Sequence, residues 1–147
     1  MTRYLLALNL LAQGRSDDAL AEALQEPEEI CRLCALSVIH HSAARRVEAD
    51  AVLHELIAKH AGDAAYQVAI VYAARGETDR ALEWLERAYA QRDSGLSEMK
   101  IQSWLRSLHA DPRWGGLLGK MELADQDSAA LQPGLRRPPQ DDKPMTA

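Results

Sequence analysis

The chain has few of the residues from which β-sheets are usually built. None of its 147 residues is phenylalanine, and aromatic residues make up only 5% of the sequence. Runs in which β-branched or aromatic residues alternate with polar ones, the pattern of a half-buried strand, are also missing. Alanine and leucine dominate instead. We therefore expect an all-α protein.

An excess of positive charge and long hydrophobic runs are missing as well. The formal net charge is -5, without a stripe of lysine and arginine, so nucleic acid is not an expected partner. The longest apolar run, Tyr4–Ala12, is interrupted by Asn9 and is too short to cross a bilayer, so no membrane is expected either. The first residues resemble a weak secretory signal, but a first repeat helix that ends at Gly14 explains the same residues and is preferred. A cytoplasmic protein is the expectation.

Two cysteines are too few for the disulfide framework of a small secreted protein. Cys31 and Cys34, with His41 on the same helix face, form the one group that could carry thiol or metal chemistry. Structural zinc needs a second ligand pair at matching spacing, which the chain lacks, and Glu28 and Glu29 raise rather than lower a neighbouring thiol pKa. We expect no metal, no cofactor and no catalytic residue. A thiol or metal enzyme built on Cys31, Cys34 and His41 is kept as an alternative.

The stretch Ala65–Tyr89 has the pattern of two amphipathic helices that fold back on each other. Apolar residues recur every three or four positions in both halves, which places them on one helix face. Gly76 can end the first helix because glycine adopts a left-handed backbone without steric cost. Thr78 or Asp79 is then expected to accept hydrogen bonds from the free amides that begin the second helix. The stretch therefore predicts a helical hairpin.

The same order of helix, turn and helix occurs three times. We predict the first helix of each copy near residues 3–13, 29–42 and 63–75, and the second near 16–25, 46–60 and 78–91. Ala19, Ala49 and Ala81 occupy equivalent positions, 30 and 32 residues apart, and Ala44 replaces the turn glycine in the middle copy. Such copies depend on one another, because each hairpin needs neighbours to bury both of its faces.

This arrangement resembles the tetratricopeptide repeat (TPR), a helix-turn-helix unit of 34 residues. The third copy matches the TPR pattern in order at Ala65, Val68, Ala69, Tyr72, Gly76, Ala81, Leu85 and Ala88. It departs from the pattern at the large first residue, where Ala65 stands, and at the closing proline, where Asp93 stands. The resemblance implies a right-handed α-solenoid of about three hairpins that serves as an interaction module.

After Gly95 the repeat pattern stops. A short helix is expected within Ser97–Leu108, with Trp104 on its apolar side. Asp111 followed by Pro112 then predicts the start of a C-terminal capping helix that buries Trp114.

This C-terminal segment resembles the one that closes TPR arrays in some bacterial multidomain regulators. We assign residues 1–124 to a TPR-like helical repeat domain. Residues 125–147 are rich in proline and in charges of both signs and lack a periodic apolar face, so they predict a disordered tail.

A non-catalytic adaptor that binds a protein or peptide is the function these features predict. The TPR resemblance implies that the first helix of each repeat lines a concave groove, at positions that are here mostly apolar: Tyr4, Leu8, Leu11, Cys31, Cys34, Val38, His41, Asp63, Tyr66, Ile70 and Ala73. They lack the lysine, asparagine and arginine set with which chaperone-binding TPR domains clamp a C-terminal carboxylate. An apolar or amphipathic peptide is therefore the expected partner.

Two other interpretations of the groove stay open. The protein could be a structural homo-oligomer whose copies bury the groove between them. Alternatively, the copies pack more tightly than the TPR register implies, so that these side chains lie in a closed core. Leu8→Lys and Ile70→Lys distinguish the cases, because an unpaired charge unfolds a closed core but leaves an open groove folded.

Overall fold

The computed structural model describes the backbone of residues 3–99 and 102–130, and the side chains of these residues as far as Met121. Every regular element in these ranges is helical, which confirms the all-α prediction. Six α-helices come first: α1 (Arg3–Ala12), α2 (Ser16–Leu24), α3 (Glu29–Ser42), α4 (Arg46–His60), α5 (Ala65–Ala74) and α6 (Thr78–Ala90). Two short 3-10 turns, η1 (Ser94–Glu98) and η2 (Ser103–Leu108), and the long helix α7 (Pro112–Ala130) follow.

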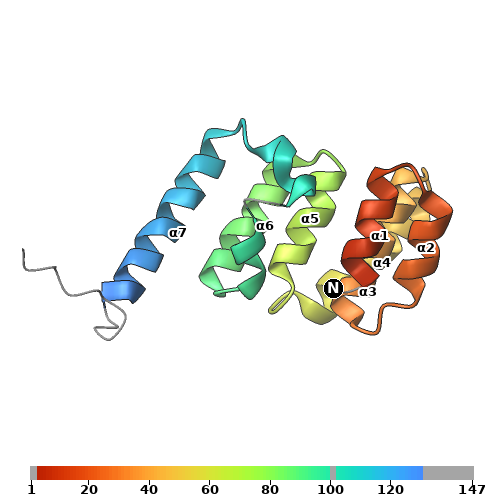
Figure 1. The fold of residues 1–147 in the computed structure, drawn as a ribbon, viewed down its shortest axis with the longest axis horizontal. Helices are drawn as coiled ribbons and strands as arrows, with labels where there is room; N and C mark the ends of the chain where they lie inside the picture. Colours follow the sequence, from red (N-terminus) through yellow and green to blue (C-terminus); the bar gives the residue numbers. More distant parts are fainter. Residues whose placement is uncertain (1–2, 100–101, 131–147) are drawn as a thin grey trace, which may run out of the picture.

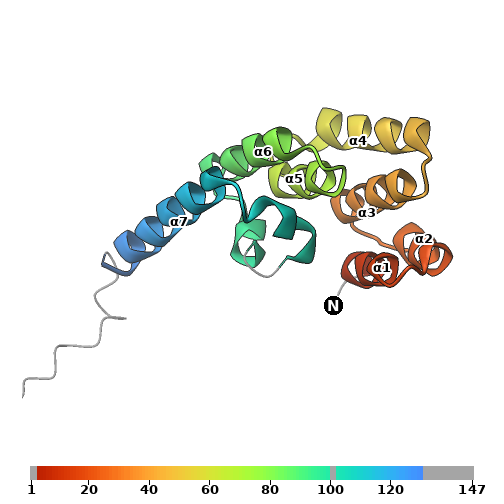
Figure 2. The same cartoon turned by 90° about the horizontal axis from the view of Figure 1, so that it is seen from above.

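Consecutive helices pack in pairs, α1 with α2, α3 with α4, and α5 with α6. The pairs pack one on the next in a row, with α7 beside α6 (Figure 1); the second pair lies behind the first in this view. Figure 2 shows that the row is bent: α1 and the η1–η2 segment both lie on its inner side and face each other there. The six predicted helices of the repeats begin and end within two residues of those observed.

The turn between the two helices of each pair has the same backbone conformation. Gly14, Ala44 and Gly76 have φ values of +80°, +61° and +77°. In each turn the amide of the following residue donates to a carbonyl five residues back, in the bonds Arg15 to Leu10 (2.9 Å), Arg45 to His40 (2.9 Å) and Glu77 to Tyr72 (3.0 Å). Ala44 therefore adopts the glycine conformation that its position in the repeat predicts.

The predicted side-chain caps of the second helices do not form. Neither α2 nor α6 has a side-chain hydrogen bond at its N-terminus. Asp79 instead accepts a hydrogen bond from the Arg113 side chain at 2.7 Å and so ties α6 to α7. Because the chain passes directly from the turn into the helix, Asp79 already lies in the first turn, where a carboxylate is stabilised by the helix dipole.

Small residues allow the paired helices to approach closely. Ala19, Ala49 and Ala81 are all fully buried, as expected for equivalent positions in the second helices. In the middle pair the buried Ser37 hydroxyl on α3 donates to the carbonyl oxygen of Ala49 on α4 at 3.1 Å. That bond satisfies a polar group which would otherwise be costly to bury.

The C-terminal segment differs from its predicted form. In place of one short helix, the two 3-10 turns η1 and η2 fold against α5 and α6. Trp114 is buried as predicted, whereas Trp104 is half-buried at the edge of the core. Helix α7 runs to Ala130, past the predicted start of the tail at Asp125; residues 131–147 of that tail lie outside the described ranges.

None of the helices in the described ranges combines the length and the apolar character needed to cross a membrane.

Candidate functional site

The side chains predicted to line an open groove are mostly buried. Of the eleven groove positions, eight are shielded from solvent: Tyr4, Leu8, Leu11, Cys34, Val38, Tyr66, Ile70 and Ala73. Cys31 and His41 are half-buried, and Asp63 is exposed. The prediction of a continuous exposed apolar groove is therefore wrong, and the interpretation of these residues as a closed core fits the structure.

Two kinds of packing close the predicted groove. Helices α1, α3 and α5 contact one another along the row, so their apolar side chains bury one another. In addition, η1 and η2 cover α5, and their buried residues Leu96, Leu105 and Leu108 belong to the same core, as does Met99 directly after η1. The packing of η1 and η2 on α5 could not be predicted from the repeat pattern, because these two turns lie outside the repeats.

The cover over α5 depends on Gly95. A Cβ atom at this position would lie 2.5 Å from Cδ1 and 2.8 Å from Cγ of Tyr66, closer than atoms can pack. Asp93 fixes the same contact through hydrogen bonds, because its carboxylate accepts from the amide of Gly95 at 2.8 Å and from that of Tyr66 at 3.2 Å. The chain after α6 is thus held against the first turn of α5.

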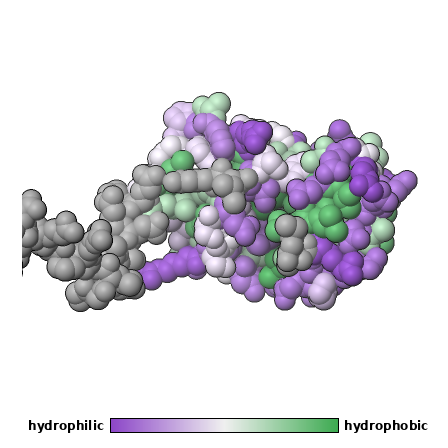
Figure 3. All heavy atoms as spheres, viewed as in Figure 1, coloured by the Kyte–Doolittle hydropathy of each residue, from purple (hydrophilic) through white to green (hydrophobic). Residues whose placement is uncertain are grey.

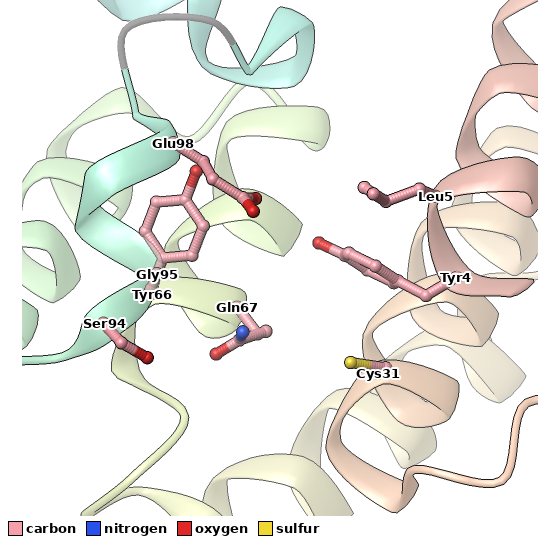
Figure 4. A pocket seen from close by; sticks show the side chains of 8 residues that line it. All are labelled: Tyr4, Leu5, Cys31, Tyr66, Gln67, Ser94, Gly95 and Glu98. Atoms are coloured by element: carbon pink, nitrogen blue, oxygen red, sulfur yellow. The ribbon is translucent and has the colours of Figure 1, made fainter. Parts of the chain in front are cut away.

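A cleft of about 260 Å³ remains open between this cover and α1. Its walls come from four parts of the chain, namely α1, α3, α5 and η1, through Tyr4, Leu5, Cys31, Tyr66, Gln67, Ser94, Gly95 and Glu98. Figure 4 shows Tyr4, Leu5 and Cys31 on one side and Glu98, Tyr66 and Ser94 on the other, with the Tyr4 hydroxyl and the Glu98 carboxylate pointing into the space between them. Figure 3 views the face of the molecule that carries α1 and η1, where apolar and polar residues lie side by side.

Two polar atoms at this cleft lack a hydrogen-bond partner among the described residues. They are the hydroxyl oxygen of Tyr66, a residue only 2% exposed, and the side-chain carbonyl oxygen Oε1 of Gln67. Buried polar atoms are almost always hydrogen-bonded, since leaving one unpaired costs roughly 1–3 kcal/mol.

The Glu98 carboxylate lines the cleft, and those of Glu26 and Glu28 act on Cys31 in its wall. Burial raises the pKa of the Cys31 thiol to about 11, and the nearby carboxylates of Glu26, Glu28 and Glu98 add to this effect. Burial likewise raises the pKa of the Tyr66 hydroxyl, with a further contribution from Glu98. Negative charge therefore acts on the parts of the wall formed by Cys31 and Tyr66.

Two arginines that neighbour cleft residues in the sequence bind other groups of the protein. Arg3 pairs with Glu22 at 2.8 Å, and the Arg32 side chain donates to the backbone carbonyl of Glu26 at 2.9 Å. Lys100, close to Glu98 in sequence, lies outside the described residues.

The two thiols are not poised for catalysis. Burial raises the pKa of Cys34 to about 12, and its sulfur lies 3.9 Å from the Tyr4 hydroxyl and 3.6 Å from the carbonyl oxygen of Gln67. With Cys31 at about 11, both thiols are protonated at neutral pH and are poor nucleophiles. Cys31, Cys34 and His41 are not brought together with other side chains as a possible metal site, and residues 3–99 and 102–121 contain no such group of three or more ligands.

A second depression of about 320 Å³ lies where α4, α5 and α6 meet, around Arg75 and Arg80. Carboxylates balance the charges of both arginines, because Arg75 binds Asp50 at 2.6 Å and Arg80 lies 3.7 Å from Glu77. Nε and Nη2 of Arg75 have no hydrogen-bond partner among the described residues. Arg80 also stacks over the Tyr72 ring, 5.7 Å from its centre. This internal pairing makes it a weaker candidate than the cleft at Tyr4 and Tyr66.

The groove positions assigned from the repeat pattern include some of the residues that line the cleft, but not all of them. Tyr4, Cys31 and Tyr66, all groove positions, do line it. Leu5 and Gln67 were missed although each directly follows one of the two tyrosines, so they also occupy equivalent repeat positions. Ser94, Gly95 and Glu98 could not be found from periodicity, because the repeat pattern stops at Gly95 and does not say what the following chain packs against.

Comparisons with known proteins gave no relative: no protein-family model matches the chain, and no match was found among curated proteins or solved structures.

Proposed function

We propose that this protein is a small, non-catalytic interaction module of the TPR-like, right-handed α-solenoid type, and that it binds a short amphipathic peptide segment of a partner protein in the cleft between α1 and η1. The repeat architecture is supported by three turns with the same left-handed residue and the same hydrogen bond. Their spacing of 30 to 32 residues is slightly shorter than that of the TPR unit.

The observation that carries the proposal is an open cleft whose wall contains both polar and apolar groups. The Tyr4 hydroxyl and the Glu98 carboxylate point into the space (Figure 4) and can hydrogen-bond to a peptide, while Leu5 and the ring of Tyr4 supply apolar contact. This mixture suits an amphipathic peptide rather than a purely apolar one. The surrounding carboxylates disfavour a phosphate backbone.

The alternative of a homo-oligomer has lost its main support. It relied on an open apolar groove that a second copy would bury, yet those side chains are already buried within one chain. Among the residues whose side chains are described, the large apolar ones that stay exposed lie on three different helices: Leu6, Leu24 and Val47. Scattered exposed residues of this kind are common on monomeric proteins.

A peptide library displayed on phage, selected on the full chain, tests the proposal. Ser94→Trp fills the cleft from its exposed edge, and Ser107→Trp on η2 is a matched control, because Ser107 is exposed but does not line the cleft. Circular dichroism should show both variants folded. We expect selected peptides to bind the wild type and Ser107→Trp alike and to lose at least tenfold in affinity for Ser94→Trp. Failure to enrich any peptide, or equal binding by Ser94→Trp, would contradict the proposal.

A further inference from the structure

The described part of the cleft wall carries a net negative charge. Among the described residues that line the cleft, Glu98 is the one that is charged at neutral pH, and its carboxylate points into the open space (Figure 4). The thiol and the hydroxyls in the wall stay neutral, because burial raises the pKa of Cys31 to about 11 and also raises the pKa values of Tyr4 and Tyr66. These neutral groups leave the charge of Glu98 uncompensated within the described wall.

The charge of Glu98 acts on both sides of the cleft. Glu98 belongs to η1, yet its carboxylate contributes to the raised pKa of Cys31 on the opposite side as well as to that of Tyr66 on α5. Glu26 and Glu28, in the link between α2 and α3, act on Cys31 in the same direction. A ligand group between the two sides therefore meets a negative potential, which favours a cation over a neutral or anionic group.

The groups that point into the cleft also suit a hydrogen-bond donor on an apolar stem. The Glu98 carboxylate can only accept hydrogen bonds, and the Tyr4 hydroxyl oxygen can accept one too. Lysine and arginine side chains end in groups that donate several hydrogen bonds and accept none. Their methylene stems pack on apolar surface while the charged end stays in a polar environment. Leu5 and the Tyr4 ring provide that apolar surface, on the side that faces Glu98 (Figure 4).

We infer that the partner peptide inserts one basic side chain, a lysine or an arginine, into the cleft between α1 and η1. The charged end lies between the Glu98 carboxylate and the Tyr4 hydroxyl, and the stem lies along Leu5. The inference rests on the proposed function and deepens it, because it names the class of residue that the cleft recognises. The same negative charge disfavours a peptide with an acidic residue at this position.

The charge preference of the cleft can be measured without a peptide. The Cys31 thiol faces the cleft (Figure 4), so a small thiol joined to it in a mixed disulfide places its other end there. The full chain is equilibrated with the oxidised and reduced forms of cysteamine, and separately with those of mercaptoethanol, which carries a hydroxyl in place of the ammonium group. Peptide mapping by mass spectrometry gives the modified fraction of Cys31, while Cys34 is fully buried and should stay free.

The readout is the ratio of the two equilibrium constants, cysteamine over mercaptoethanol. We expect this ratio to fall about threefold in Glu98→Gln, since one unit charge is lost near the ammonium group. Comparison of the variant with the wild type cancels the intrinsic chemistry of each reagent. Glu83→Gln, at an exposed position on α6, changes the net charge equally and should leave the ratio unchanged. An unchanged ratio in Glu98→Gln, with both variants folded by circular dichroism, would overturn the inference.

The peptides selected on phage provide the second test. We expect them to share a lysine or arginine whose replacement by glutamine weakens binding to the wild type about tenfold, and binding to Glu98→Gln much less. Peptides that need Ser94 unsubstituted, and so bind in the cleft, but tolerate this replacement would overturn the inference and leave the proposed function standing. Failure to enrich any peptide would overturn both.

Discussion

The buried carboxylate of Glu26 accepts a hydrogen bond from the backbone amide of Tyr4 at 2.8 Å, across 22 residues of chain. It also accepts one from the amide of Glu28 at 3.1 Å. Glu26 belongs to the link between α2 and α3, and Tyr4 to the first turn of α1. One side chain therefore caps α1 from outside and holds the first helical pair against the second.

Removal of this cap should lower the free energy of unfolding. Glu26→Ala leaves the Tyr4 amide without its partner and removes two charge-assisted bonds, so we expect a loss of about 1–3 kcal/mol in the free energy of unfolding by urea. Glu28→Ala, at an exposed position two residues away, is the control. It should change the free energy of unfolding by less than about 0.5 kcal/mol. Equal effects of the two substitutions would show that the Glu26 bond does not hold α1.

The glycine at the cover over α5 should not tolerate a side chain. Gly95→Ala places a methyl group within 2.5 Å of the Tyr66 ring, and because that ring is buried we expect a loss of about 1–3 kcal/mol in the free energy of unfolding. Gly116→Ala is the matched control: it meets no atom within 4 Å and lies inside α7, where alanine favours the helix by about 1 kcal/mol. A Gly95→Ala protein as stable as the wild type would show that η1 does not pack on Tyr66 as described.

The middle turn offers a stabilising substitution. Ala44 has φ +61°, a conformation that costs a residue with a side chain about 1 kcal/mol and costs glycine little. Because Ala44 is exposed, Ala44→Gly loses no packing, and thermal melts should show a gain of about 0.5–1 kcal/mol. Ala43→Gly, next to it at φ -85°, should instead lose a similar amount. Destabilisation by Ala44→Gly would mean that the turn is not left-handed.

Much of this fold could be predicted from sequence, for identifiable reasons. The positions of Gly14 and Gly76 determined where the first helices end, and the spacing of Ala19, Ala49 and Ala81 predicted three equivalent pairs. Local pattern suffices there, because the helices and turns depend on neighbouring residues. The closure of the groove could not be predicted in this way, since it depends on which distant surface the residues after Asp93 contact.

The thiols should be unreactive in the folded protein. With a pKa of about 11 for Cys31, alkylation by iodoacetamide at pH 8 should be on the order of 100-fold slower than in urea, where a cysteine has a pKa near 8.5. The contribution of the protonated Cys31 thiol to the stability of the folded state is fully present below pH 8.5. It is lost as the pH rises towards 11. Mass spectrometry of both cysteines in the folded and unfolded chain measures the rates, and rapid alkylation of folded Cys31 at pH 8 would reveal an activated thiol instead.

The most direct test of an open cleft in an otherwise closed face compares two lysine substitutions one helical turn apart on α5. Ile70 is fully buried, so Ile70→Lys should lower the free energy of unfolding by several kcal/mol. Gln67 borders the cleft, so Gln67→Lys should stay within about 1 kcal/mol of the wild type, because its ammonium group can reach the cleft and its carboxylates. Equilibrium unfolding of both variants in urea, followed by circular dichroism, gives the two values. The structure predicts that only Ile70→Lys collapses; a stable Ile70→Lys protein or an unfolded Gln67→Lys protein would contradict it.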